Sequence, residues 1–298
     1  MIETNSRTRQ GIKMQKKTFS LILFLIFSLG VPVKSIAKNN PLKYGDIEYT
    51  VREYSPSTNI RNSIFVPANL NGMAVAVLPS CTGIQDHSVS DLHRWTKLLL
   101  ENNFVVSVTD YNAPGRPSGA QNCGKGGKTP HMRQIKDAYD AISALSKIPG
   151  VNSDKIFMLG FSRGAQIAGS AARGSMLNLA TTSLNWGPKP KGIIGLYGAC
   201  AYSASKIHVD ASIATNILWM MGKNDVYYMK GCEEDAFEII KIKNKHSKFI
   251  HFENASHCWD CVGLSGTFIA REGQTYMYNG NITRQSETEA LQFMKQFE

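Results

Sequence analysis

A serine between two glycines is the first feature of the sequence that could carry out chemistry. Residues 160–164 read GFSRG and fit the pattern Gly-x-Ser-x-Gly, with Ser162 at its centre. A serine hydroxyl can attack an acyl carbon when a histidine removes its proton and a carboxylate orients that histidine. The pattern is short and occurs by chance. The surrounding elements must therefore decide between a nucleophile and a capping serine in a strand-to-helix turn.

The segments on either side of Ser162 predict a strand followed by a helix. KIFMLG (155–160) is an apolar run typical of a buried strand, and the alanine-rich segment after Ser162 is typical of a helix. The same alternation continues along the chain. Strands are predicted at 73–79, 104–110, 191–200, 216–222 and 248–253, and helices at 91–103, 132–147, 233–243 and 287–297. This order predicts an α/β fold with a mostly parallel central sheet flanked by helices. Ligand sites in such a sheet lie at the carboxyl ends of the strands.

The base and the acid should follow Ser162 in the order acid, then histidine, each just after a strand. Asp225 lies three residues beyond the predicted strand 216–222. His257 lies in a loop shortly after the predicted strand 248–253. The other downstream histidines, which fit this position less well, are His208, His246 and His251. We therefore expect Ser162 to be the nucleophile, His257 the general base and Asp225 the acid that orients it.

The loop after strand 73–79 is a candidate for the oxyanion hole. It reads SCTG at 80–83, and small residues permit a close approach of the backbone to a substrate. We expect the backbone N–H of Cys81, with Thr82 as the alternative, to act together with that of Arg163. No metal-binding pattern and no cofactor motif accompanies these residues.

The order of these segments resembles the α/β-hydrolase fold and, within it, the dienelactone hydrolase-like family. The resemblance rests on VLPSCTG, VTDYNAPGR, MLGFSRGAQIA, MMGKNDVYY and ENASHCW, and it extends over roughly residues 60–297. It places Ser162, Asp225 and His257 at the triad positions and the Cys81 region at the oxyanion loop. It implies hydrolysis of an ester or related acyl bond in a small molecule, without a cofactor.

Two departures from the family pattern narrow this expectation. The oxyanion loop of the family usually contains His-Gly where this chain has Pro79-Ser80. Dienelactone hydrolases proper use a cysteine nucleophile, so Ser162 favours a serine esterase. A peptidase of the same fold is one alternative, and a non-catalytic or redox-linked binding protein is the other.

Six cysteines permit up to three disulfides, and the sequence does not choose among the fifteen complete pairings. They are Cys81, Cys123, Cys200, Cys232, Cys258 and Cys261. Cys81 and Cys123 both fall in loops expected above the strand ends, so they are candidates to pair. Cys258 and Cys261 form a Cys-x-x-Cys motif that could close on itself or bond to Cys200 or Cys232. A second cysteine or histidine pair at zinc-finger spacing is absent from the sequence, and the motif does not begin a helix as a thioredoxin-type site would.

The first 37 residues predict a cleaved secretory signal. Basic residues precede an apolar run at 19–33, and the small residues Ser35 and Ala37 offer a cleavage site near Ala37. An uncleaved membrane anchor is the alternative, but the run is shorter than a membrane span. Met14 could be the true start. We expect export to the periplasm or the medium, with one domain over residues 38–298 and no stable membrane insertion of the mature protein.

The composition and charge are typical of a globular protein and do not favour nucleic-acid binding. The chain has 298 residues, of which 43% are hydrophobic and 19% charged, as in ordinary globular proteins. Its net charge of +10 arises partly from residues 1–37, which hold six basic residues and one acid, so the remainder carries +5. Arginine-rich tracts are absent from the sequence, and nucleic-acid binding is not expected. The oligomeric state is not predicted.

Overall fold

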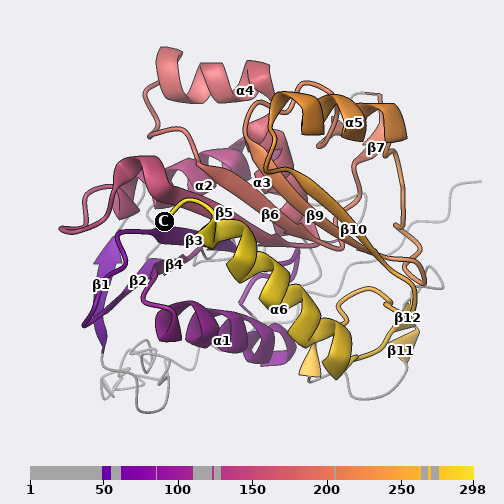
Figure 1. Ribbon diagram of the computed structural model, residues 1–298, viewed down its shortest axis with the longest axis horizontal. Helices are drawn as coiled ribbons and strands as arrows, with labels where there is room; N and C mark the ends of the chain where they lie inside the picture. The colour runs from indigo at the N-terminus through magenta and orange to yellow at the C-terminus, as the bar shows by residue number, and fades with distance from the viewer. Residues whose placement is uncertain are drawn as a thin grey trace, which may run out of the picture. The chain divides into compact units, whose positions relative to one another are not determined.

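Eight strands form a single sheet in the computed structural model (Figure 1). The structure describes residues 49–54, 62–84, 86–109, 123, 129–204, 206–262, 268–269 and 275–298. The strand order is β1-β2-β4-β3-β5-β6-β9-β10. The bounds are β1 (Tyr49–Tyr54), β2 (Asn62–Pro67), β3 (Ala74–Leu78), β4 (Val105–Val108), β5 (Ile156–Phe161), β6 (Gly192–Leu196), β9 (Asn216–Gly222) and β10 (Lys248–Phe252). From β4 to β10 all neighbouring strands are parallel, whereas β2 runs antiparallel to both β1 and β4.

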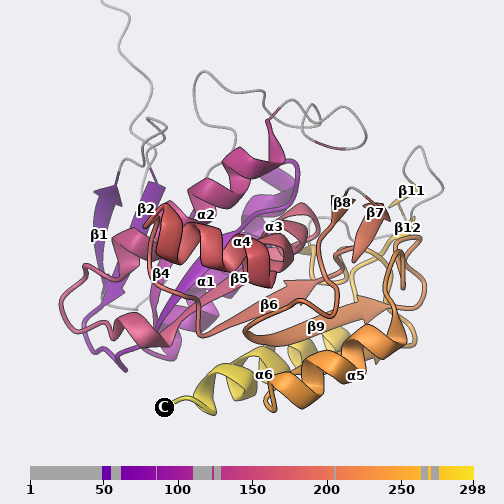
Figure 2. The ribbon, with the colours of Figure 1, turned by 90° about the horizontal axis from the view of Figure 1, so that it is seen from above.

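Helices cover both faces of this sheet (Figures 1 and 2). They are α1 (Asp86–Glu101), α2 (His131–Leu145), α3 (Arg163–Ala172), α4 (Gly174–Asn178), α5 (Glu234–Lys243) and α6 (Gly280–Lys295), with a 3-10 turn η3 (Ser153–Lys155) and a π-helical turn η4 (Leu179–Ser183). The apolar side chains of α2, α3 and α5 belong to one buried cluster, and those of α1 and α6 belong to another. The predicted α/β architecture with a mostly parallel sheet is therefore confirmed.

The central strands are buried on both faces because their side chains alternate between the two clusters. In β3, Ala74, Ala76 and Leu78 belong to the cluster with α2 and α3. Val75 and Val77 belong to the cluster with α1 and α6. This alternation is the two-residue period of an extended chain, and burial on both faces explains why these strands read as continuous apolar runs. Because β5, β6, β9 and β10 are paired in parallel, the carboxyl ends of β5, β9 and β10 lie on the same edge of the sheet.

Some elements differ from the sequence prediction. The last helix begins at Gly280, seven residues before the predicted start at 287. Asn279 caps it, since its side-chain oxygen accepts hydrogen bonds from the backbone N–H groups of Asn281 and Ile282. The short hairpins β7 (Ala201–Ser203) with β8 (Lys206–Ile207) and β11 (Phe268–Ile269) with β12 (Thr275–Tyr276) were not predicted. Each of these strands has only two or three residues, too few to show a hydrophobic period.

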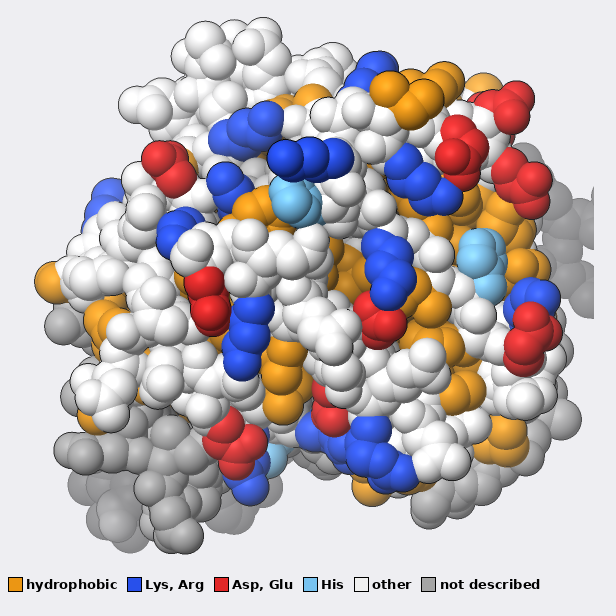
Figure 3. All heavy atoms as spheres, viewed as in Figure 1, with side chains coloured by type: hydrophobic (Ala, Val, Ile, Leu, Met, Phe, Trp, Pro, Cys, Tyr) orange, Lys and Arg blue, Asp and Glu red, His pale blue; other side chains and the backbone are white. Residues whose placement is uncertain are grey.

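Charged side chains of both signs lie side by side on the face that carries α6 (Figure 3). The Lys248 ammonium lies 2.6 Å from a carboxylate oxygen of Glu289 on α6. Arg94 of α1 forms an ion pair with Glu287 of α6, which ties the two helices on this face together. Within the described part of the chain, no helix combines the length and apolar content needed to span a membrane. The predicted signal segment lies outside the described residues.

Candidate active site

Ser162 occupies a tight turn between β5 and α3. Its φ is +50°, a left-handed conformation that costs non-glycine residues on the order of 1–3 kcal/mol. The Ser162 N–H donates to the carbonyl of Leu196 at the end of β6, at 2.9 Å. The Ser162 carbonyl accepts the N–H of Gln166, at 3.1 Å, as the first turn of α3 forms. The turn therefore holds the side chain at the end of β5 and at the N-terminus of a helix.

The two glycines of the motif are required by close backbone contacts. A Cβ on Gly160 would lie 2.3 Å from the carbonyl carbon and oxygen of Gly164. A Cβ on Gly164 would lie 2.0 Å from the carbonyl oxygen of Leu78 and 2.6 Å from that of Pro79. These distances also show that the loop after β3 runs directly beside the first turn of α3.

Gly164→Ala is expected to destabilise the protein by roughly 2–4 kcal/mol, because the atoms that meet the new methyl group are backbone atoms that cannot rotate away. A urea unfolding curve of the purified variant measures this change. Gly280→Ala is the matched control, since its Cβ would lie 3.2 Å from the hydroxyl of Tyr278, the end of a movable side chain. Equal stability of the two variants would contradict the argument.

The structure brings the three predicted triad residues together. Ser162 Oγ lies 3.0 Å from His257 Nε2, and His257 Nδ1 lies 2.7 Å from Asp225 Oδ2. His257 is 4% exposed and Asp225 is 6% exposed, so both are removed from water. The second carboxylate oxygen, Oδ1 of Asp225, accepts the backbone N–H of Tyr227 at 2.8 Å. This geometry can hold a proton on Nδ1 and leave the Nε2 lone pair facing the serine hydroxyl.

The remaining downstream histidines have other partners. A ring nitrogen of His246 lies 2.9 Å from the side-chain oxygen of Gln296, and one of His251 lies 3.0 Å from the hydroxyl of Tyr228. His208 lies next to Ser170 on α3, at 2.8 Å. Of the four downstream histidines, His257 is the one that lies next to Ser162, as its place in the sequence predicted.

Aromatic rings surround the His257 imidazole. The ring of Tyr197 lies 4.9 Å from it, that of Tyr276 5.3 Å and that of Tyr227 5.5 Å, measured between ring centroids. Tyr197 follows β6 directly and has a φ of +44°. Its hydroxyl donates to Oδ1 of Asp260, which is fully buried, at 2.9 Å. Burial raises the pKa of Asp260, and burial likewise raises the pKa of Tyr197. Sequence reasoning missed Tyr197 and Asp260.

The candidate oxyanion residues lie at the ends of β3 and β5. The loop after β3 forms a turn in which Gly83 N–H donates to Ser80 O, at 3.0 Å. A disulfide between Cys81 and Cys123 ties this loop to a residue 42 positions later. The side chain of Arg163 donates from Nε to the side-chain oxygen of Gln134 at 3.0 Å, so it binds an amide of α2. The roles of the Cys81 and Arg163 backbone amides stay predictions.

All six cysteines are paired. Besides Cys81–Cys123, which confirms the pairing considered from the sequence, the pairs are Cys200–Cys232 and Cys258–Cys261. The Cys-x-x-Cys motif therefore closes on itself, one residue after His257.

A second buried polar cluster lies between α2, α3 and the β7–β8 hairpin. Ser170 Oγ lies 2.9 Å from Nε2 of His131 and 2.8 Å from Nδ1 of His208. Burial lowers the pKa of His131 to about 4, with a smaller contribution from the charge of Arg163. Burial lowers the pKa of His208 to about 3, and the neighbouring His131 adds to the effect. Both rings are therefore neutral in the folded protein near neutral pH.

This cluster predicts a loss of stability in acid. The unfolded chain protonates these histidines near pH 6.5, whereas the folded protein does so only near pH 4 and pH 3. The unfolding free energy should therefore fall as the pH drops below 6.5, by roughly 2–3 kcal/mol per histidine by pH 4. Urea unfolding at pH 7, 5.5 and 4 measures this slope. His131→Gln/His208→Gln should have a much shallower decline, and an unchanged slope in that variant would contradict the assignment.

Comparisons with known proteins agree with the fold. The model of the dienelactone hydrolase family matches residues 60–298. No curated protein matches the sequence significantly. Among solved structures, a dienelactone hydrolase-like promiscuous phosphotriesterase from metagenomic libraries has 18% sequence identity and a TM-score of 0.59, with 83% of this chain and 98% of that chain covered.

Two further structures share the fold. Thermogutta terrifontis esterase 2, phosphoramylated by tabun, has 14% identity and a TM-score of 0.59, with 84% of this chain and 94% of that one covered. MGS-M1, an α/β hydrolase from a Medee basin deep-sea metagenome library, has 13% identity and a TM-score of 0.54, with 83% and 97% covered. At these identities the likeness concerns the fold. Because the family match extends over most of the sequence, the chain belongs to the dienelactone hydrolase family.

Proposed function

We propose that the protein is an exported serine hydrolase that cleaves an ester or a related acyl bond of a small molecule. The observation that carries this proposal is the chain of contacts from Ser162 Oγ to His257 Nε2, at 3.0 Å, and from His257 Nδ1 to Asp225 Oδ2, at 2.7 Å. Three side chains from the ends of three parallel strands meet in the geometry that activates a serine. Membership of a hydrolase family supports the same reaction class.

The reaction proceeds in two steps. His257 removes the proton of Ser162 as Oγ attacks the acyl carbon, and the Asp225 carboxylate stabilises the imidazolium that forms. The backbone N–H groups of Cys81 and Arg163 stabilise the oxyanion, aided by the N-terminus of α3. His257 then gives its proton to the leaving alcohol. Water, deprotonated by the same imidazole, releases the acyl group from Ser162. In this proposed cycle, every proton transfer passes through His257.

Export is part of the proposal. The predicted signal over residues 1–37 supports it, as do three disulfides within one chain, which persist in oxidising compartments. The mature protein would begin near residue 38 and consist of one hydrolase domain. N-terminal sequencing of the protein secreted by cells that express the full sequence tests the cleavage site. A protein retained in membranes with residues 1–37 intact would show an anchor instead.

A panel of p-nitrophenyl esters of increasing acyl length tests the reaction. We expect a burst of nitrophenol equal to the enzyme concentration, followed by slower steady turnover, because an acyl-enzyme accumulates. A fluorophosphonate should label Ser162, since organophosphorus groups modify an esterase of the same fold. A folded protein that neither hydrolyses esters nor takes the label, yet retains a ligand, would be a binding protein. Faster cleavage of peptide amides than of esters would point to a peptidase.

A further inference from the structure

The Cys258–Cys261 disulfide closes a tight turn that begins one residue after His257. The N–H of Cys261 donates to the carbonyl of Cys258 at 3.0 Å, which completes the turn. Cys258 has a φ of +53°, a conformation that non-glycine residues keep only when their surroundings hold it. The disulfide is one of these constraints. Opening it would release Cys258, and Cys258 is covalently attached to the proposed general base.

The two cysteine residues differ in their exposure to solvent. Cys258 is half-buried, whereas Cys261 is 2% exposed. An external thiolate must approach along the line of the disulfide and bond to the accessible sulfur. Attack therefore occurs at Cys258 Sγ, and Cys261 is the leaving group inside the protein.

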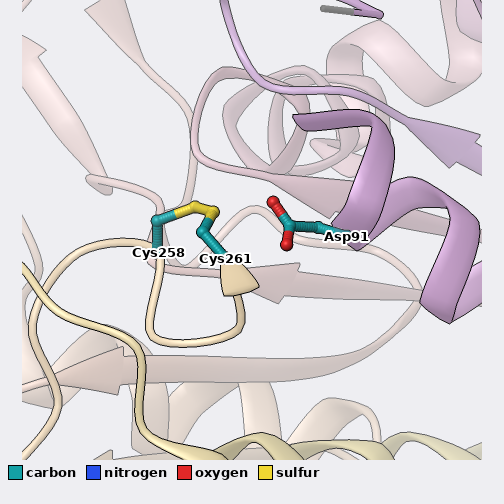
Figure 4. Close-up of side chains that lie close together, drawn as sticks. All are labelled: Asp91, Cys258 and Cys261. Atoms are coloured by element: carbon teal, nitrogen blue, oxygen red, sulfur yellow. A yellow bond between two sulfur atoms is a disulfide. The ribbon is translucent and has the colours of Figure 1, made fainter. Parts of the chain in front are cut away.

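A buried carboxyl group lies beside these sulfurs. The Asp91 carboxylate and the two sulfur atoms lie within 4.8 Å of one another, and Figure 4 shows Asp91 pointing from α1 toward the disulfide. Asp91 is 4% exposed. A thiolate that forms at Cys261 is costly in such surroundings unless it receives a proton. The Asp91 carboxylate adds a negative charge beside that thiolate, so the departing Cys261 takes its proton from the reagent.

Tyr197 connects the disulfide to the catalytic imidazole. Its hydroxyl oxygen lies 3.7 Å from Cys258 Sγ, and its ring centroid lies 4.9 Å from that of His257. One side chain thus contacts both groups. A shift of Cys258 therefore reaches His257 along the backbone and through the Tyr197 ring.

The rest of the turn has anchors that do not depend on the disulfide. The carbonyl of Trp259 accepts the N–H of Asn279 at 2.8 Å and the hydroxyl of Thr283 at 3.0 Å. Asp260 accepts the indole N–H of Trp95 at 2.8 Å. The disulfide spans three positions, against 42 and 32 for the other two, and loop-closure entropy grows with loop length. Its opening should therefore change the turn without unfolding the protein.

We propose that Cys258–Cys261 is a reducible disulfide that switches hydrolytic activity: a dithiol opens it, and the open form turns over substrate more slowly. A thiolate of the dithiol attacks Cys258 Sγ, the Cys258–Cys261 bond breaks, and Cys261 leaves with the electron pair and takes the proton of the reagent's second thiol. The second thiol of the reagent then displaces Cys258 from the mixed disulfide. The protein gains two electrons and two protons, and the dithiol leaves as a disulfide.

This inference rests on the proposed function and adds a form of regulation to it. The oxidised enzyme holds His257 against Ser162 and Asp225, and the reduced enzyme does so less well. A reducing cytosol would then keep the hydrolase slow before export, and an oxidising compartment would complete it.

The test is to equilibrate the full protein with defined ratios of reduced to oxidised dithiothreitol. Free thiols are alkylated with iodoacetamide and located by peptide mass mapping, while kcat for p-nitrophenyl acetate and the circular dichroism spectrum are recorded in parallel. We expect Cys258 and Cys261 to be alkylated before the other four cysteines. The value of kcat should fall about tenfold over the same range with an unchanged spectrum, and reoxidation should restore it.

Two variants separate the parts of the proposal. Cys258→Ser/Cys261→Ser should have a low kcat that no longer responds to dithiothreitol. Asp91→Asn should keep the kcat of the oxidised enzyme and open its disulfide several-fold faster, because it removes the negative charge beside the departing Cys261 thiolate. The switch is overturned if the disulfide stays closed until the protein unfolds, or if it opens with no change in kcat. If the oxidised protein neither hydrolyses esters nor takes a fluorophosphonate, the proposed function fails instead, and thiol mapping still decides whether the disulfide exchanges.

Discussion

Ser162→Ala should lower kcat for ester hydrolysis by about 10⁴- to 10⁶-fold and abolish labelling by a fluorophosphonate. The hydroxyl lies 3.0 Å from His257 Nε2, and in the proposed reaction it supplies the atom that bonds to the acyl carbon. A methyl group cannot form an acyl-enzyme. The residual rate would come from water activated by His257 and from the oxyanion donors, which the substitution leaves in place.

The fold should survive this substitution. The left-handed turn is held by backbone contacts, namely the hydrogen bond from Ser162 N–H to Leu196 O and the close packing of Gly160 and Gly164. Ser175→Ala on α4, an exposed serine, is the matched control and should keep the parent kcat and labelling. A Ser162→Ala protein that retains its native circular dichroism spectrum and more than a tenth of the parent kcat would exclude Ser162 as the nucleophile.

The proximity of Ser162, Asp225 and His257 could be predicted because it depends on local patterns and one topological rule. A strand, a Gly-x-Ser-x-Gly turn and a helix are contiguous in the sequence, so the environment of Ser162 is local. Asp225 and His257 lie 63 and 95 positions later, yet parallel strands bring their carboxyl ends to one edge of the sheet. The positions of the predicted strands in the sequence were therefore enough to place all three residues at one edge of the sheet.

The rule that parallel strands end at one edge of the sheet could also have predicted the position of Tyr197. It follows β6, which pairs with β5 on one side and β9 on the other, so it had to lie between Ser162 and Asp225 at that edge. Its aromatic side chain carries no catalytic signal of its own. The ring contact with His257, at 4.9 Å, and the bond to Asp260 give it a place in the site.

Other features could not be predicted because they depend on contacts between distant segments. The Trp95 indole meets Asp260 across 165 positions, and no periodicity relates the two. His131 lies on α2, Ser170 on α3 and His208 directly after β8, the second strand of a hairpin too short to predict. The three disulfides are one of fifteen possible pairings, and only the folded chain selects among them.

Asp225→Asn should lower kcat by about 10³- to 10⁴-fold while leaving the fold intact. The reason lies in the two oxygens of the carboxylate. Oδ1 accepts the N–H of Tyr227 at 2.8 Å, so an asparagine keeps its single oxygen there. Its NH₂ group then faces His257 Nδ1, where Oδ2 now lies at 2.7 Å. A donor at that place forces Nδ1 to accept, so the ring proton moves to Nε2.

With its proton on Nε2, His257 presents a donor to Ser162 Oγ and cannot remove the serine proton. The loss should therefore appear in kcat, with KM little changed, and fluorophosphonate labelling should slow in proportion. Asp210→Asn is the matched control, because Asp210 also accepts a backbone N–H two residues later, from Ser212, yet pairs with Arg173. If the Asp225→Asn enzyme keeps kcat within threefold of the parent, the carboxylate does not set the tautomer of His257, and the triad reduces to a serine–histidine pair.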